Sequence, residues 1–270
     1  MDKEPFLELY KKLRLISDDS LPLPIHQVCS HRERCWEGSN DRFPPDDEES
    51  SHISRPWVGP RYEELRLATI GVNLNGYGGL DALVDLTEEA KEKISDGWRK
   101  VRFGAEYKDY SGSFLWHRLG SYSTAFAEFF DLIKATWGDD GYPEVEDVSS
   151  AFDFIAFLEH IKCSPIGENS KPTAAMWENC GAHILRQELL LLKPAHILVL
   201  GTSDNSSNLH DMVFDSGWQD CVQIGEVLRA KGKIGGSPVT IWVVRHPTSY
   251  GGASNSIVQD LRKALQEKEA

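Results

Sequence analysis

The chain has 270 residues, of which 40% are hydrophobic and 10% aromatic, and its formal net charge is −13. This apolar share is enough for a packed core, so the composition excludes a chain that is disordered throughout. The acidity argues against a protein coated in nucleic acid, and the absence of any run of about 18 apolar residues argues against a membrane span.

The N-terminal stretch is charged and carries apolar residues at helical spacing, which predicts an amphipathic helix over residues 4–15 rather than a signal peptide. We therefore expect a cytoplasmic protein. Its five cysteines are then thiols or cluster ligands rather than disulfides. Residues 37–56 are polar and rich in Pro, Ser and acidic residues, which predicts a surface loop.

Predicted strands and helices alternate along the rest of the chain. Apolar and β-branched runs predict buried strands at 67–72, 154–158, 197–200 and 239–244, and a weaker strand at 222–227. Helical patterns lie at 121–137, about 171–192, 203–214 and 255–267, with a charged helical insertion at 80–110 and a turn at 232–236. This alternation predicts one α/β domain over residues 1–270, built on a mainly parallel sheet.

Polar side chains come at the ends of three predicted strands: Asn73, Glu159 and His246. In an open α/β sheet, ligands bind at such strand ends. Glu159 ends an apolar run, so its carboxylate needs partners or a cleft. The alternatives are a structural histidine and a surface glutamate. The glycine-rich stretch 73–79 lacks the spacing of a dinucleotide or P-loop motif, so we expect no nucleotide cofactor.

Three segments together resemble the uracil-DNA glycosylase superfamily, particularly its iron–sulfur branches. Gly-Val-Asn-Leu-Asn-Gly-Tyr-Gly at 71–78 is similar to the first active-site motif of the single-strand-selective branch, and Arg-His-Pro-Thr-Ser at 245–249 to the second motif. The most specific match is 162–180, which resembles the cluster-binding segment. The resemblance covers about residues 65–80 and 111–268, and it implies a three-layer α/β/α fold around the mainly parallel sheet.

The resemblance also implies a structural [4Fe-4S] cluster held by four cysteine thiolates. The candidate ligands are Cys29, Cys35, Cys163 and Cys180, which leaves Cys221 as a core thiol. The first pair of the family is usually spaced Cys-x-x-Cys, but five residues separate Cys29 and Cys35 here. Zinc or unliganded thiols are therefore the alternatives.

Such an enzyme binds DNA and flips a nucleotide into a pocket before it breaks the N-glycosidic bond. We expect the protein to be a monomer. The resemblance gives His246 the task of donating a hydrogen bond to the base oxygen as negative charge develops there. Asn73 would position the attacking water, because an amide can orient water but cannot accept its proton.

The resemblance further implies which residues contact DNA. Phe114 falls where the family stacks an aromatic ring on the base, with Trp116 as the alternative. Tyr250 falls where a wedge side chain fills the gap left by the flipped nucleotide. The remaining candidates are Asn75 and Tyr77 at the base, and Arg245 and Thr248 at the DNA.

Two departures from the family pattern bear on the substrate. Glu159 stands where an asparagine usually reads the uracil edge, and a carboxylate accepts hydrogen bonds from the amino group of cytosine. Asn75 stands where the most uracil-specific members have a tyrosine that blocks 5-substituents. The prediction is a modified cytosine, such as the glucosylated 5-hydroxymethylcytosine of some phages, and hence antiviral defence. The alternatives are a repair glycosylase for uracil or another deaminated base, a non-catalytic DNA-binding module, and covalent trapping of DNA by the histidine.

Overall fold

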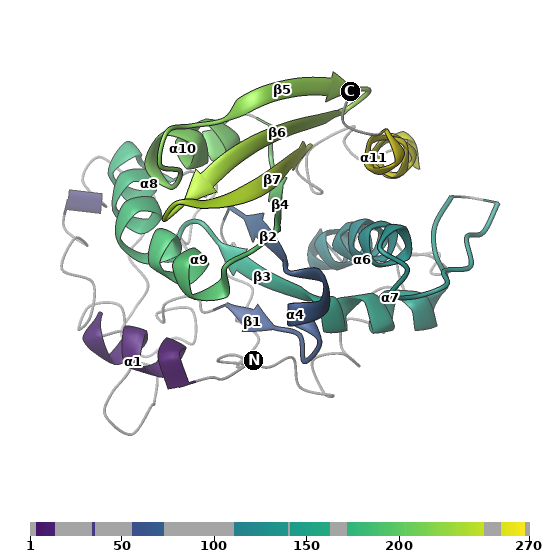
Figure 1. Cartoon of the computed structure of the whole chain (residues 1–270), viewed down its shortest axis with the longest axis horizontal. Coiled ribbons are helices and arrows are strands. Elements are labelled where there is room, and N and C mark those ends of the chain that lie inside the picture. The colour runs from purple at the N-terminus through teal and green to yellow at the C-terminus, as the bar shows by residue number, and fades with distance from the viewer. Residues whose placement is uncertain are drawn as a thin grey trace.

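Figure 1 shows the computed structural model of the chain. The structure describes residues 4–13, 34–35, 56–72, 111–139, 141–162, 172–202, 204–245 and 255–267, with backbone only at 111–118, 145, 204 and 255. These residues form one mixed sheet with helices on both of its faces. The strands are β1 (Trp57–Val58), β2 (Leu67–Gly71), β3 (Ile155–Glu159), β4 (His196–Leu200), β5 (Gln219–Ile224), β6 (Val227–Ile234) and β7 (Ser237–Val244).

The sheet has seven strands in the order β1-β3-β2-β4-β7-β6-β5. The central strands β3, β2, β4 and β7 are parallel to one another. The strands at the two edges run antiparallel, with β1 against β3 on one side and β6 and β5 beyond β7 on the other. The predicted α/β class and the parallel centre of the sheet are confirmed.

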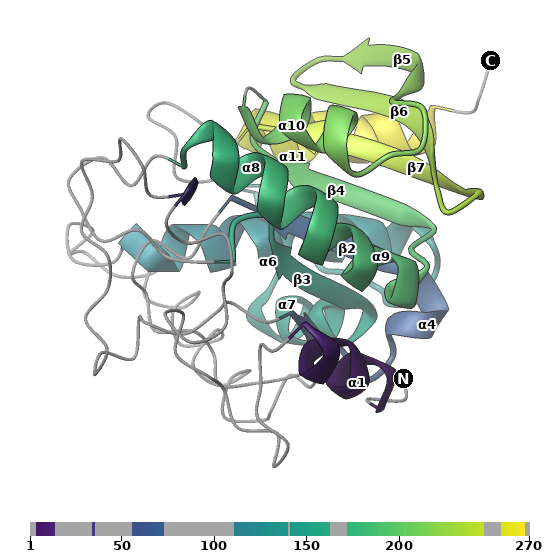
Figure 2. The ribbon, with the colours of Figure 1, turned by 90° about the vertical axis from the view of Figure 1, so that its left-hand side faces the viewer.

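Helices cover both faces of the sheet, as the two views in Figures 1 and 2 show. One face carries α6 (Ser111–Phe129), α7 (Val145–Ala151) and α11 (Asn255–Gln266), and the other carries α1 (Glu4–Lys12), α8 (Ala174–Cys180), α9 (Arg186–Leu192) and α10 (Asp204–Met212). Shorter helical turns are α4 (Tyr62–Leu65), the 3-10 turn η3 (Phe152–Phe154) and the π turn η4 (Gly181–Leu185). None of the helices in the described ranges is long and apolar enough to cross a membrane.

Successive residues of the central strands enter two different cores, because side chains alternate across a sheet. In β4, Ile197 and Val199 pack in the core on the α8 side, whereas Leu198 and Leu200 pack in the core on the α6 side. Both faces are therefore apolar, which is why these strands stand out in the sequence as continuous hydrophobic runs. The four central strands lie within two residues of their predicted bounds at each end.

The helices agree with the sequence less evenly. The helical stretch predicted from about residue 171 is confirmed as α8, η4 and α9, and the Thr173 hydroxyl caps it by accepting a hydrogen bond from the Met176 amide at 3.3 Å. The helix predicted over 121–137 is wrong at both ends, since α6 begins at Ser111 and ends at Phe129. The chain leaves the helix at Asp131, whose φ of 58° lies in the left-handed region.

The region before β7 also differs from its prediction. Instead of one weak strand over 222–227, two antiparallel strands meet at a turn that contains Gly225, with a φ of 56°. The predicted turn over 232–236 is shorter, because Gly232 lies within β6, against the ring of Phe214. Edge strands of this kind have one solvent-facing side and weak hydrophobic patterns, so the sequence signal for them is poor.

Candidate functional site

The four parallel strands separate into two pairs at their carboxyl ends. Pairing between β2 and β4 stops at Ile70 and Val199. The next strand along the chain after β2 is β3, on one side, whereas the chain after β4 continues to β5, β6 and β7, all on the other side. Such a point, where successive connections diverge, is where open α/β sheets bind their ligands. We call this opening between the ends of β2 and β4 the fork.

Each pair of strands stays joined beyond the fork. On one side, the amide of Ile161 donates a hydrogen bond to the carbonyl oxygen of Val72 at 2.8 Å, which continues the pairing of β3 with β2. On the other side, the amide of Gly201 donates to the carbonyl oxygen of Val244 at 2.8 Å, which continues the pairing of β4 with β7. Each side of the fork is thus held together by backbone hydrogen bonds of its own.

Glu159, at the end of β3, is a buried carboxyl group beside the fork. It is 2% exposed, and neither of its carboxyl oxygens has a hydrogen-bond partner among the described residues. Burial raises its pKa from the ordinary value of 4.5 to about 8, against the opposing charge of Lys162. Glu159 is therefore protonated at neutral pH, so it can donate one hydrogen bond and accept another.

Gly71 makes the room for this carboxyl group. It pairs with Glu159 in register across β2 and β3. A Cβ atom at residue 71 would lie 2.4 Å from the Oε2 atom of Glu159, which is closer than real Cβ contacts. The absence of a side chain at Gly71, the first glycine of the predicted active-site motif, thus leaves space for the carboxyl group of Glu159.

The opposite face of the sheet carries a second polar group, which the sequence did not point to. His160 is buried, and its Nδ1 atom lies 3.0 Å from the Oδ1 atom of Asn205 on α10. Burial lowers the pKa of His160 to about 4, so its ring is neutral. The amide nitrogen of Asn205 donates to two backbone carbonyls, so Oδ1 faces the ring and Nδ1 of His160 carries the proton.

Lys162 forms a buried ion pair. Its Nζ atom lies 2.6 Å from Oε2 of Glu188 on α9, and the side chains are 1% and 0% exposed. The hydroxyl of Tyr10 on α1 donates to the other oxygen of Glu188 at 3.3 Å. Lys162 therefore links the end of β3 to α9 directly, and to α1 through the carboxylate of Glu188.

Two of the four candidate cluster ligands lie in the described part of the chain, and both are buried at α8. Cys35 accepts a hydrogen bond from the side-chain amide of Asn179 at 3.3 Å, and its carbonyl accepts one from the Thr173 hydroxyl at 2.5 Å. Cys180 is the last residue of α8. Burial raises the pKa of the Cys35 thiol. Both thiols thus lie at the same helix, and cysteine sulfur is the donor that an iron–sulfur cluster requires.

The other two candidate ligands, Cys29 and Cys163, lie outside the described residues. Within the described ranges, no group of three or more His, Cys, Asp or Glu side chains could hold a metal ion. The expectation that Cys221 is a core thiol is wrong, because it is exposed on the edge strand β5. Most of the residues around Cys221 are polar and give no sign of burial. The prediction followed only from assigning the other four cysteines to the cluster.

The remaining predicted site residues are placed in part. Arg245 follows β7 at the fork side of the sheet, and its guanidinium group pairs with the Glu226 carboxylate at 3.0 Å. Phe114 belongs to α6, of which only the backbone is described there. The other candidates lie outside the described residues: Asn73, Asn75, Tyr77, His246, Thr248 and Tyr250. By sequence, Asn73 and His246 directly follow described residues on opposite sides of the fork.

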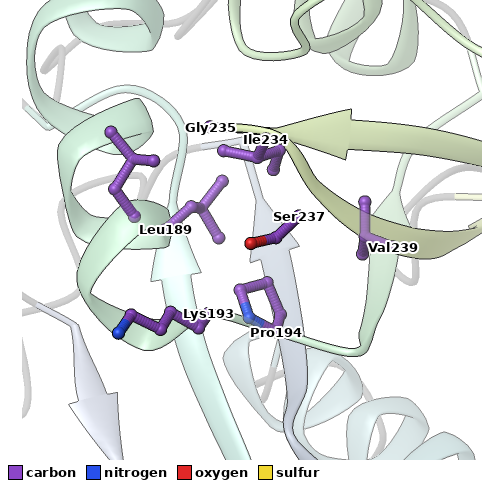
Figure 3. A pocket seen from close by; sticks show the side chains of 8 residues that line it. Leu189, Lys193, Pro194, Ile234, Gly235, Ser237 and Val239 are labelled. Carbon is purple, nitrogen blue, oxygen red and sulfur yellow. The ribbon is translucent and has the colours of Figure 1, made fainter.

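A surface hollow lies at the amino ends of β4 and β7, and Figure 3 shows it from close by. Leu189 and Lys193 line it from the end of α9, and Ile234, Ser237 and Val239 line it from the β6–β7 hairpin. Most of the described residues that line it are apolar, and Lys193 adds an ionisable side chain. This hollow lies beside the residues that begin β4 and β7, whereas the fork lies at the carboxyl ends of the strands.

Neither a scan against protein-family models nor a search of curated proteins returned a match for the chain.

Proposed function

We propose that the protein is a DNA glycosylase with a uracil-DNA-glycosylase-like fold, which flips out a base and hydrolyses its N-glycosidic bond to leave an abasic site. The observation that carries the proposal is Glu159. Burying a carboxyl group that has no hydrogen-bond partner among the described residues lowers the stability of the fold. Glu159 lies at the carboxyl ends of the parallel strands, where open α/β sheets bind ligands. A flipped base with complementary hydrogen-bonding groups would satisfy it.

The chemistry divides between the two sides of the fork. Asn73, which follows β2, orients the attacking water toward the sugar carbon. His246, which follows β7, donates a hydrogen bond to the base oxygen as the glycosidic electron pair moves onto the base. Glu159, from β3, holds the edge of the base. Water adds its oxygen to the sugar, and the released base takes up a proton.

The preferred substrate is a modified cytosine, such as glucosylated 5-hydroxymethylcytosine in phage DNA. A protonated Glu159 accepts a hydrogen bond from the cytosine amino group and donates one to N3. The raised pKa of Glu159 also favours a second candidate, because a neutral carboxyl group can instead accept from N3–H of uracil and donate to its O4. A repair glycosylase for uracil or another deaminated base is therefore the second proposal.

An excision assay tests both proposals. We expect abasic sites in duplexes that carry glucosylated 5-hydroxymethylcytosine, and none in duplexes that carry cytosine. Excision of uracil alone would contradict the modified-cytosine proposal and support the second one. An Asn73→Ala, His246→Ala double variant serves as the control, since it removes both catalytic groups. Excision that survives in this variant would show that other residues perform the chemistry.

We further propose that Cys29, Cys35, Cys163 and Cys180 hold a [4Fe-4S] cluster, which supplies a rigid cross-link between segments rather than a reacting group. The buried positions of Cys35 and Cys180 at α8 support this proposal. No catalytic role is assigned to the cluster.

Replacing Cys180 with serine is expected to reduce the iron content and the visible absorbance of anaerobically purified protein, because a serine hydroxyl is a poor substitute for a thiolate ligand. Cys221→Ser is the matched control, since Cys221 is exposed on β5 and should leave both properties unchanged. Equal iron in the two variants would contradict the ligand set, and zinc in place of iron would identify the alternative metal.

A further inference from the structure

We propose that Asn205 is a positioning residue: it bridges the fork between β2 and β4 and thereby sets the separation of the two catalytic motifs that follow on its two sides. The catalytic consequence depends on the proposed glycosylase function, whereas the bridge itself is a property of the described residues and can be tested without activity.

The side-chain amide of Asn205 lies where the sheet divides. Asn205 is 2% exposed, and its Nδ2 atom lies 3.1 Å from the carbonyl oxygen of Leu200 in β4 and 3.4 Å from that of Ile70 in β2. Backbone pairing between these strands has just ended, at Ile70 and Val199. The two N–H bonds of one amide group therefore continue the link between β2 and β4 beyond the last rung of the ladder.

His160 fixes the orientation of this amide. Its Nδ1–H group donates to Oδ1 of Asn205 at 3.0 Å. If the amide were flipped, its oxygen would face two carbonyl oxygens and its nitrogen would face the Nδ1–H group of the ring, so all three hydrogen bonds would be lost. The ring itself is held in place by an edge contact with Trp177 on α8, with ring centroids 4.7 Å apart. Residues from the ends of β3, β2 and β4 thus meet at one side chain of α10.

The bridge lies close, along the chain, to both predicted catalytic residues. Ile70 is three residues before Asn73 on one side of the fork. Leu200 pairs with Val244, which is two residues before His246, on the other side. Backbone pairing holds each side of the fork together, so the width of the fork determines how far apart the two motifs begin. Because a misplacement of about 1 Å can lower a catalytic rate by about 10²-fold, a bridge at this point acts on the reaction.

The test compares two variants at the bridge with a matched control. Asn205→Ala removes the bridge, and Asn205→Asp keeps its shape but places a carboxylate oxygen against the two carbonyls. The control is Thr69→Val, which removes another buried hydrogen bond of a β2 side chain, from Oγ1 to the Ala156 carbonyl at 2.9 Å, without spanning the fork. We expect kcat for the excised base to fall by about 10²-fold in both Asn205 variants, with little change in KM. Thr69→Val should retain kcat.

Hydrogen exchange of the backbone amides provides the readout that needs no activity. Exchange at the amides around Ile70 and Val199, the last residues paired across β2 and β4, should become faster in Asn205→Ala than in Thr69→Val, after correction for global stability. Unchanged exchange at these amides overturns the bridge. Faster exchange together with an unchanged kcat overturns the positioning role.

Two further outcomes are distinguishable. If the unmodified protein excises no base, the proposed function fails, and exchange alone decides whether Asn205 holds the fork. If Asn205→Ala does not fold, His160→Phe takes its place, because the phenyl ring keeps the packing on Trp177 while removing the hydrogen bond that orients the amide. His160→Phe is then expected to speed exchange and to lower kcat in the same direction as Asn205→Ala, but by a smaller factor.

Discussion

Replacing Glu159 with leucine is expected to raise the free energy of unfolding and to lower excision sharply. The carboxyl group is buried and has no hydrogen-bond partner among the described residues, so its removal relieves a desolvation penalty of about 1–3 kcal/mol. The base loses the hydrogen bonds that recognise it, which corresponds to a drop of about 10–100-fold in kcat/KM. A gain in stability that accompanies a loss of activity is characteristic of a residue retained for function.

The stability gain of Glu159→Leu should depend on pH. The unfolded chain ionises this carboxyl group above its ordinary pKa of 4.5, whereas the folded protein keeps it protonated up to a pKa of about 8. The unfolded state therefore binds fewer protons in this window, and the unmodified protein loses stability as the pH rises through it. Leucine has no such dependence, so the difference between the two proteins grows from pH 4.5 to about pH 8 and then levels off.

Denaturant unfolding at pH 5 and at pH 8, together with excision assays, checks this prediction. Glu64→Leu is the control, because Glu64 is exposed and ion-paired with Arg61 at 2.7 Å. It should show no stability gain that increases with pH. A Glu159→Leu variant that is less stable than the unmodified protein would mean that the carboxyl group has partners in the folded chain, and the site would have to be reinterpreted.

Replacing Lys162 with methionine is expected to lower the free energy of unfolding by about 3–5 kcal/mol. The change removes one partner of a fully buried ion pair and leaves the Glu188 carboxylate with the hydroxyl of Tyr10, at 3.3 Å, as its one remaining hydrogen-bond partner among the described residues. The loss arises mainly from the uncompensated buried charge rather than from the attraction between the two groups.

A double variant separates these two origins. Lys162→Met combined with Glu188→Leu removes both charges, so it should recover most of the stability that the single change loses. Arg61→Ala provides the comparison with an exposed ion pair, whose loss should have a much smaller effect. All three are compared by chemical denaturation under the same conditions. Additive losses in the double variant would contradict this explanation, since they would mean that the two side chains do not interact.

The central strands and the helix from Thr173 onward were predictable from the sequence for local reasons. Strands buried on both faces need continuous apolar runs, and these are visible in the residues of β2, β3, β4 and β7. The cap at Thr173 and the break before Pro194 are likewise local signals. Glu159 could be singled out for the same reason, because a carboxylate that ends an apolar strand contradicts its surroundings.

Other features depended on contacts between distant parts of the chain. The β5–β6 hairpin and the exposure of Cys221 follow from a position at the sheet edge, which the local pattern does not encode. The pairing of His160 with Asn205 joins residues 45 positions apart, and only the strand order brings them together. The sequence by itself thus determined which segments are buried and which residues stand at the strand ends. The tertiary structure decided where the sheet divides and which side chain bridges the division, because hydrogen bonds at a fork are set by the order of strands in space rather than along the chain.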